Sequence, residues 1–275
     1  MDHQDSASLK KTLQSGRQNP FWVSGPCVIE DRDLLARVGE TLAEISQSLD
    51  VPVVFKASFD KANRTAHSSF RGVGLEQGLK DLLWVKEQFG LPLLTDVHES
   101  SQVSAVAEVV DILQIPAFLC RQTDLLKAAC ETGRAINVKK GQFLSPSNVK
   151  AILDKLEHFG SQAHWITERG FTLGYQRLVV DFSALPEMER AGADMILDVT
   201  HSVQLPGGEG DRSGGIREAI PYLARAGAAA GVMGFFAETH PDPSIAKSDG
   251  ANAWPLHQLR DLMASVKAIA QVAHG

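Results

Sequence analysis

Six basic side chains in this acidic sequence could bind a multiply charged anion. The chain has 275 residues and a formal net charge of −6, and the six are Lys56, Lys61, Arg64, Lys139, Lys140 and Arg169. Phosphate and carboxylate groups suit such a set, because Arg offers a planar fork of donors and Lys a point charge. The sequence has no Walker A or G-x-G-x-x-G motif, so the pattern favours a small phosphorylated acid or sugar over a nucleotide.

Four further residues combine side-chain types that bind transition metals. Cys27, His201, Glu238 and Asp249 offer one thiolate, one imidazole and two carboxylates. This set suits Zn²⁺, Fe²⁺ or Mn²⁺ without selecting among them. A cysteine after a Gly-Pro pair is also commonly a small buried apolar residue, and we interpret the other two cysteines in that way. The four residues therefore predict a divalent metal site only if the fold brings them together.

Strand-like apolar runs alternate with amphipathic helical stretches along the whole chain. The predicted strands cover Trp22–Ile29, Pro52–Lys56, Leu91–Val97, Asp111–Ile115, Ala135–Lys139, His164–Thr167, Asp194–Val199 and Val232–Ala237. The predicted helices between and after them cover Arg32–Ser48, Leu75–Phe89, Ser101–Val110, Asp124–Thr132, Asn148–His158, Ala184–Ala191, Ile216–Ala229 and Pro255–Val272. Strands that are each followed by a helix in this way are typical of an α/β fold of the (β/α)₈ TIM-barrel class. The alternative is an open doubly wound sheet, which usually has fewer strands.

The barrel prediction explains how distant reactive residues could converge. An enzyme of this class has its active site at the C-terminal ends of its strands. Most of the basic residues end or follow the second, fifth and sixth predicted strands, and Asp96 and Gln114 lie at the ends of the third and fourth. In a closed barrel the first strand neighbours the eighth, so Cys27 can meet Glu238. The alternative is that these residues lie on separate solvated faces.

We expect one catalytic domain over residues 21–275, preceded by a short N-terminal extension over residues 1–20. The extended stretch Phe171–Asp181 has no place in this scheme. Five glycines lie between Gly207 and Gly215, in the segment PGGEGDRSGG. Because glycine loses the most backbone entropy in regular structure, this segment is predicted to be neither strand nor helix interior. It is either a lid that closes over substrate or an ordinary surface loop.

Composition limits the location and the partners of the protein. The longest run without Asp, Glu, Lys or Arg has 12 residues, far fewer than the roughly 18 that a membrane span needs. The N-terminus has no apolar core of a secretory signal, and three sparse cysteines favour a reducing compartment. No block of basic residues suggests a nucleic acid or a membrane surface as a partner. We therefore expect a cytoplasmic protein that acts on small molecules.

Seven segments resemble the 3-deoxy-D-manno-octulosonate 8-phosphate synthase family. They are FKASFDKANRTA, LTDVHE, QIPAFLCRQTDLL, NVKKGQF, ITERG, DVTHSVQ and AETHPDP, in this order between Val23 and Asn252. The resemblance implies a homotetrameric (β/α)₈ barrel that condenses phosphoenolpyruvate with D-arabinose 5-phosphate. Water is consumed, inorganic phosphate leaves, and the product feeds the synthesis of the lipopolysaccharide inner core.

The resemblance also assigns roles to individual residues. Lys61, Lys139 and Arg169 match the anchors of phosphoenolpyruvate, with Lys56 and Gln114 nearby. Contacts to the arabinose phosphate and its hydroxyls are implied for Asn63, Arg64, Thr65 and Asp96. Arg121 resembles a residue that reaches the sugar phosphate bound by a neighbouring subunit. Of these, Lys61, Asp96 and Lys139 are expected to be catalytic.

Cys27 resembles the metal-requiring members of the family, since metal-free members carry Asn at that position. The segment Ser248–Asn252 also departs from the Cys-Asp-Gly-Pro of metal-free members. The resemblance thus implies the metal ligands Cys27, His201, Glu238 and Asp249.

Three alternative functions remain at this stage. The related 3-deoxy-heptulosonate 7-phosphate synthases accept erythrose 4-phosphate, and they carry Lys-Pro-Arg-Thr where this chain has Lys61-Ala62-Asn63-Arg64. A Schiff-base aldolase would use a strand-end lysine such as Lys139 as its nucleophile. A non-catalytic sugar-phosphate-binding protein would bind both ligands and release no phosphate.

Overall fold

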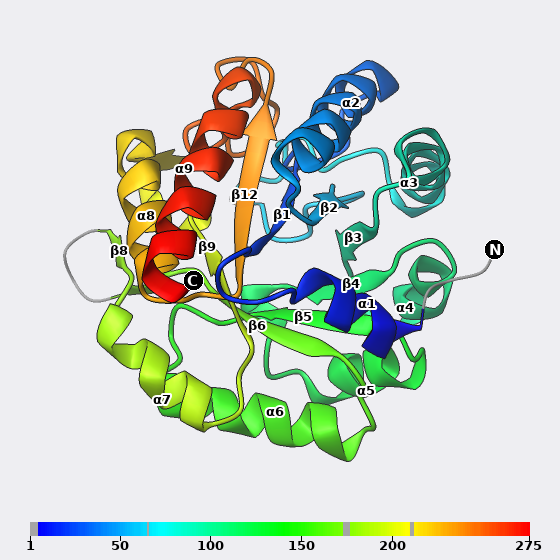
Figure 1. Ribbon diagram of the computed structural model, residues 1–275. Coiled ribbons are helices and arrows are strands. Elements are labelled where there is room, and N and C mark those ends of the chain that lie inside the picture. Colours follow the sequence, from blue (N-terminus) through cyan, green and yellow to red (C-terminus); the bar gives the residue numbers. More distant parts are fainter. Residues whose placement is uncertain (1–4, 65, 173–176, 210–211) are drawn as a thin grey trace.

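The chain folds into a closed barrel of parallel strands surrounded by helices (Figure 1). The computed structural model describes residues 5–64, 66–172, 177–209 and 212–275, with backbone only for 206–209 and 212–213. The barrel strands are β1 (Phe21–Gly25), β2 (Val53–Lys56), β3 (Leu93–Asp96), β4 (Ile112–Ile115), β5 (Ala135–Lys139), β6 (His164–Glu168), β9 (Met195–Asp198) and β12 (Gly234–His240). They pair in this order, and the pairing of β1 with β12 closes the barrel. The predicted (β/α)₈ barrel is confirmed, and the open sheet is excluded.

A helix follows each barrel strand and covers its outer face (Figure 1). These helices are α2 (Arg32–Leu49), α3 (Leu75–Phe89), α4 (Ser100–Ala107), α5 (Thr123–Glu131), α6 (Val149–His158), α7 (Leu185–Arg190), α8 (Ile220–Ala229) and α9 (Leu256–His274). None of these helices extends beyond the stretch predicted from sequence by more than two residues. The longest two begin at clear signals: the Asp31 side chain accepts a hydrogen bond from the Leu34 amide at the start of α2, and Pro255 precedes α9. Among the described residues, no helix is long and apolar enough to cross a membrane.

The barrel interior has two layers of opposite chemistry. Because side chains alternate between the two faces of a strand, every second residue points inward. Toward the N-terminal ends of the strands the inward residues form an apolar cluster, here called the lower layer; its barrel members are Phe21, Val23, Val54, Leu94, Ile112, Ala135, Ala163, Trp165, Ile196 and Phe236. Two residues further along the same faces come polar or charged side chains, here called the upper layer; they include Lys56, Asp96, Gln114, Asn137, Lys139, Thr167, Asp198 and Glu238.

The N-terminal segment closes the lower end of the barrel. Helix α1 (Ser6–Leu13) lies across the strands (Figure 1), and its Leu9 and Leu13 belong to the same apolar cluster as the lower layer. The Lys10 ammonium forms an ion pair of 2.5 Å with Asp194, just before β9. Residues 1–20, predicted as an extension, therefore include a helix that caps the barrel core.

The glycine-rich segment is not the irregular loop that its composition predicts. Strands β10 (Gln204–Glu209) and β11 (Arg212–Gly215) form a two-stranded antiparallel ribbon. The prediction failed because backbone hydrogen bonds between two strands need no side chains, so glycine is tolerated where the ribbon packs closely. A Cβ atom at Gly215, for example, would lie 1.6 Å from Oδ1 of Asn252.

Two short additions complete the described fold. The stretch Phe171–Asp181, unassigned from sequence, contains the antiparallel pair β7 (Phe171–Thr172) and β8 (Leu178–Val179). Strand β13 (Trp254–Pro255) extends the sheet beside β12 and leads into α9. The loop that carries Asp249 lies between β12 and β13.

Candidate active site

A cavity of about 1380 Å³ opens at the C-terminal ends of the barrel strands. It is lined by eleven of the residues predicted from sequence, namely Lys56, Lys61, Asn63, Arg64, Asp96, Gln114, Lys139, Arg169, His201, Glu238 and Asp249. Alternation along the strands turns Lys56, Asp96, Gln114, Lys139 and Glu238 into this space, and the other six lie in the segments that follow the strand ends. The alternative of separate solvated faces is therefore wrong for these residues.

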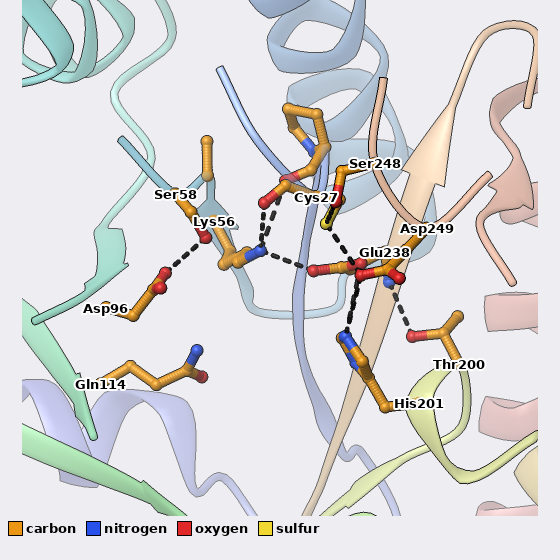
Figure 2. A network of polar contacts seen from close by, with 12 residues as sticks. Cys27, Lys56, Ser58, Asp96, Gln114, Thr200, His201, Glu238, Ser248 and Asp249 are labelled. Carbon is orange, nitrogen blue, oxygen red and sulfur yellow. Dashed lines mark hydrogen bonds and ion pairs between the residues drawn. The ribbon is translucent and has the colours of Figure 1, made fainter. Parts of the chain in front are cut away.

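The four predicted metal ligands lie close together (Figure 2), and His201, Glu238 and Asp249 line the cavity, whereas Cys27 lies behind Asp249 and is not part of the lining. The Sγ atom of Cys27 is 3.2 Å from Oδ2 of Asp249. This sulfur and one carboxylate oxygen each of Glu238 and Asp249 all lie within 4.8 Å of one another. Nε2 of His201 is 3.6 Å from Oε2 of Glu238 and 3.8 Å from Oδ2 of Asp249. Ligands at about 2.0–2.3 Å from a tetrahedral ion are separated by roughly 3.3–3.8 Å, so these spacings could hold a metal ion.

Backbone conformation helps to bring Asp249 to this position. Asp249 has a φ of 49°, in the left-handed region that Asp and Asn tolerate better than most other residues. Ser248 beside it accepts from Cys27, with Sγ 3.0 Å from its Oγ atom, and also accepts from Arg64. The loop between β12 and β13 thus folds back onto the end of β1.

Burial and neighbouring charges shift the pKa values of Cys27 and Glu238 in opposite directions. Burial, followed by the charge of Glu238, raises the pKa of the Cys27 thiol well above its ordinary value. Burial would also raise the pKa of Glu238, yet Lys56 and His201 outweigh it and lower that pKa. The cluster therefore holds a neutral thiol among ionised carboxylates. A bound metal ion would instead favour the thiolate form of Cys27.

Lys56 is used mainly inside the protein. Its ammonium is 1% exposed, lies 2.6 Å from Oε1 of Glu238 and donates to the backbone carbonyl of Cys27 at 2.9 Å (Figure 2). Oε2 of Glu238 is left facing His201. The predicted substrate-binding residue Lys56 lines the cavity, and its charge is directed at Glu238, one of the four predicted metal ligands.

A second polar group surrounds Asp96. The Asp96 carboxylate accepts from the hydroxyl of Ser58 and lies 3.0 Å from Nε2 of His98, while Lys61 donates to Ser58 at 2.9 Å. Burial opposes ionisation here, but Lys61 and His98 outweigh it and lower the pKa of Asp96. Asp96 is consequently an ionised acceptor that could orient hydroxyl groups, and a poor proton donor.

Lys139 and His201 share one carboxylate, that of Asp198. The Lys139 ammonium contacts Oδ2 of Asp198, which also lies 2.7 Å from Nδ1 of His201. The same ammonium lies 3.1 Å from the centre of the Phe236 ring. Burial lowers the pKa of Lys139 to about 8, although Asp198 opposes the shift, so the ammonium form still predominates at neutral pH.

Arg169 reaches the cavity with part of its guanidinium unused. Nη2 donates to Oε1 of Gln204 at 2.5 Å, and Nε2 of Gln204 donates to Oδ1 of Asp249 at 3.3 Å. Nη1 is buried and has no hydrogen-bond partner within the described part of the chain. Since buried polar groups are normally satisfied, this atom is well placed to bind an anionic ligand.

Gln114 is held by a ladder of side chains across three strands. Nδ2 of Asn137 donates to Oε1 of Gln114 at 3.0 Å, and Thr167 donates to Oδ1 of Asn137 at 2.6 Å. With its oxygen engaged, Gln114 presents its amide hydrogens to the cavity.

Three of the predicted residues stand apart from this picture. Lys140, included among the six basic residues, is buried, lies 3.1 Å from Glu168 and is absent from the cavity lining. It fails as an anion ligand because the residue after Lys139 points to the opposite face of the strand. Thr65 lies outside the described residues. Arg121 is exposed and does not line this cavity.

Sequence reasoning missed several residues that shape the site. Ser58, Asp198, Gln204, Phe236 and Ser248 all line the cavity or contact residues that do. A usable signal existed for two of them: Ser58 follows Lys56 by two residues on an inward face, and Asp198 ends its strand three residues before His201. Gln204 and Ser248 were recognisable only by their contacts.

Comparison with known proteins gives a consistent result. The model of the DAHP synthetase I family matches residues 5–273. The chain is 50% identical over 261 residues to the 2-dehydro-3-deoxyphosphooctonate aldolase of Acidithiobacillus ferrooxidans, covering 94% of this chain and 93% of that protein. It is 52% identical over 257 residues to the protein of the same name from Xanthomonas euvesicatoria, covering 93% of each chain. A third protein of that name, from Alkalilimnicola ehrlichii, is 50% identical over 255 residues, covering 93% of this chain and 92% of that protein.

Proposed function

This chain belongs to the DAHP synthetase I family, and we propose that it condenses phosphoenolpyruvate with D-arabinose 5-phosphate and water. The products are 3-deoxy-D-manno-octulosonate 8-phosphate and inorganic phosphate. The observation that carries the proposal is the cavity, in which Lys61, Lys139 and Arg169 converge at the C-terminal ends of the strands beside a thiol, an imidazole and two carboxylates. Relatives at about half identity over nearly the whole chain are named for the aldol chemistry of a phosphorylated eight-carbon acid.

The carbon count of that acid fits the two substrates. A three-carbon enol phosphate and a five-carbon aldose phosphate together supply the eight carbons. Carbon 3 of phosphoenolpyruvate forms the new bond to the aldehyde carbon, water adds at carbon 2, and phosphate leaves. Holding both substrates in one cavity supplies effective molarity and removes much of the entropic barrier.

We assign phosphoenolpyruvate to the cationic side of the cavity. Lys139 and the unpartnered Nη1 of Arg169 would bind its carboxylate and phosphate, with Lys61 at the junction toward the aldose. Gln114 would donate its amide hydrogens to the same anion. These cations then stabilise the charge that develops as the carbon–oxygen bonds change.

The aldose phosphate is assigned to the side lined by Asn63, Arg64 and Asp96. The ionised Asp96 accepts hydrogen bonds, which suits the sugar hydroxyls, and it is oriented by Ser58 and His98. Arg64 lines the same part of the cavity while donating to the carbonyl of Lys247 at 2.7 Å. Arg121 is assigned to the sugar phosphate in a neighbouring subunit.

A divalent transition metal is proposed as the cofactor, held by Cys27, His201, Glu238 and Asp249. Their separations fit a single ion, and two of the four, Glu238 and Asp249, are ionised carboxylates. When bound, the ion would supply Lewis acidity toward the aldehyde or the attacking water. Lys56 keeps Glu238 ionised, which is the form in which a carboxylate binds a metal ion.

We further propose a cytoplasmic homotetramer that serves lipopolysaccharide inner-core synthesis. All three cysteines are free thiols, as expected in a reducing compartment. Phe118 and Phe143 are each 58% exposed, and Phe118 lines the rim of the cavity three residues before Arg121. Exposed aromatic residues beside an exposed Arg suit a contact with another subunit.

The proposal is tested by measuring phosphate release from phosphoenolpyruvate with arabinose 5-phosphate, with erythrose 4-phosphate and with no aldose. We expect release that depends on arabinose 5-phosphate and is far slower with the four-carbon sugar. Equal or faster release with erythrose 4-phosphate would identify a heptulosonate synthase instead. Binding of both ligands without any phosphate release would identify a binding protein.

One observation favours examining the Schiff-base alternative. Lys139 is buried with a pKa lowered to about 8, a property that nucleophilic lysines share. Its ion pair with Asp198 argues for a permanent cation instead. Treatment with borohydride in the presence of a keto acid distinguishes the two, because only a Schiff base leaves a reduced adduct on Lys139.

A further inference from the structure

Asp198 is the most completely buried acidic group beside the candidate metal site. It ends strand β9, points into the barrel and has 0% exposed surface. An ionised carboxylate at such a depth is costly unless every lone pair is used. The contacts of its two oxygen atoms differ, and they show what holds it there.

One oxygen, Oδ1, fixes the plane of the carboxylate. It accepts from the backbone amides of Thr200 at 3.1 Å and His201 at 2.8 Å, and from the hydroxyl of Thr200 at 3.1 Å. These donors come from the turn that follows β9. The turn and the carboxylate are therefore locked together as one unit.

The other oxygen, Oδ2, faces the functional residues. It lies 2.7 Å from Nδ1 of His201 and also contacts the ammonium of Lys139, which balances its charge. With Nδ1 engaged, Nε2 of His201 is directed at Glu238 and Asp249. The imidazole therefore directs Nε2 toward the proposed metal site, where this nitrogen could act as a ligand.

Thr200 extends the same unit to a second ligand. Its Oγ atom donates to Asp198 and accepts from the backbone amide of Glu238 at 3.1 Å (Figure 2). The start of the Glu238 side chain is thereby fixed relative to His201. A single hydrogen-bonded unit from β9 positions ligands on two neighbouring elements.

We propose that Asp198, with Thr200, is a positioning residue that orients His201 and Glu238 for metal binding. The inference rests on the metal site of the proposed function. Carboxylates that accept the second ring N–H of a metal-bound histidine fix its orientation, and removing them typically costs 10–100-fold in metal affinity. In this proposal Asp198 acts through His201 and is not itself a metal ligand.

The test measures Zn²⁺ affinity by competition with a chromophoric chelator, so it needs no turnover. Asp198→Asn has nearly the same shape. Its amide oxygen can keep the three hydrogen bonds that Oδ1 accepts, so its NH₂ group, a donor, would face Nδ1 of His201 and the Lys139 ammonium in place of Oδ2. We expect its Zn²⁺ affinity to fall about 10–100-fold. The double variant Asp198→Asn/His201→Ala should bind Zn²⁺ no more weakly than His201→Ala alone, because the carboxylate acts through the imidazole.

Asp111→Asn is the matched control. Asp111 is also buried, accepts a backbone amide, that of Leu93, at 2.8 Å and pairs with a lysine, Lys86, at 2.7 Å, but it lies at the opposite end of the barrel. Its variant should lose stability without losing Zn²⁺ affinity. If Asp198→Asn does not fold, Thr200→Val serves instead, with an expected loss of roughly 3–10-fold that Thr200→Ser restores.

Two results would overturn the inference. One is a Zn²⁺ affinity of Asp198→Asn, or of Thr200→Val, equal to that of the unmodified protein. The other is additive losses in Asp198→Asn and His201→Ala, which would mean independent effects. Failure of the unmodified protein to bind Zn²⁺ at all would overturn the metal proposal as well, and so the two failures are distinguishable.

Discussion

The lower and upper layers of the barrel interior lie on the same strands and have opposite roles. On β2 the inward residue is Val54 in the lower layer and Lys56 in the upper, and on β9 the pair is Ile196 and Asp198. A step of two residues along a strand moves a side chain by only about 7 Å. Over that distance the interior changes from a close-packed apolar core to a cavity of about 1380 Å³ lined by charges.

This difference teaches how the protein separates stability from chemistry. Charged groups of like sign and unpartnered donors, such as Nη1 of Arg169, cost stability wherever they are buried. The lower layer and the α1 helix that covers it supply the apolar burial that offsets this cost. If the separation is real, substitutions in the two layers should change different measured quantities.

Removal of the proposed metal should have the largest effect, and it should act on the upper layer alone. Exhaustive chelation is expected to reduce turnover to background and to be reversed by a divalent transition metal. Cys27→Ala should lose the metal, because the thiolate is the softest of the four ligands. Metal content and turnover are measured together, and the melting temperature of the metal-free protein shows whether the lower layer stays intact.

Cys27→Asn sharpens this test. An asparagine amide is a weak ligand but can hydrogen-bond in the space of the metal. Since metal-free members of the family carry Asn here, the variant should keep measurable turnover that chelators no longer affect. Turnover of the unmodified protein that survives chelation with no bound metal would make Cys27 a structural thiol.

The second prediction concerns the lower layer. Trp165→Ala should reduce the free energy of unfolding by about 3–5 kcal/mol, because it leaves a large cavity where the ring packs against Phe21. The KM values of the molecules that remain folded should not change. Denaturant unfolding and steady-state kinetics measure the two quantities, and Ile196→Val, with an expected cost of about 0.5–1.5 kcal/mol, is a milder companion.

Arg121→Ala tests whether the upper layer is completed from outside its own barrel. Removing a charge-assisted hydrogen bond to the sugar phosphate should cost roughly 1.5–3 kcal/mol in binding of arabinose 5-phosphate. The KM for that substrate should rise more than the KM for phosphoenolpyruvate. Unchanged KM values for both substrates would remove Arg121 from the site.

The smallest effect is expected where the two layers meet. Thr167→Val removes the hydroxyl that orients Asn137, and through it the amide of Gln114. We expect a loss of about 1 kcal/mol in binding of phosphoenolpyruvate, seen as a KM increase of several-fold. Thr167→Ser, which keeps the hydroxyl, should restore the KM, whereas a purely structural role would affect only stability.

Sequence alone determined the barrel and eleven of the residues that line the cavity. Strand and helix periods are local properties, so they were visible in runs such as Leu91–Val97 and Leu75–Phe89. The rule that active sites lie at the C-terminal strand ends then selected residues such as Lys139 and Glu238. The four proposed metal ligands were predicted from residue type, from their places in the chain and from the family resemblance.

Only the tertiary structure decided which neighbour each of these side chains serves. It showed that Lys140 turns away from the cavity, that Lys56 neutralises Glu238, and that Asp198 joins Lys139 to His201. It also showed that the glycine-rich segment forms an antiparallel ribbon and that Leu9 packs against the lower layer of the barrel. The physical reason is that contacts between residues far apart in the chain depend on side-chain direction and closure of the barrel, which local periodicity does not encode.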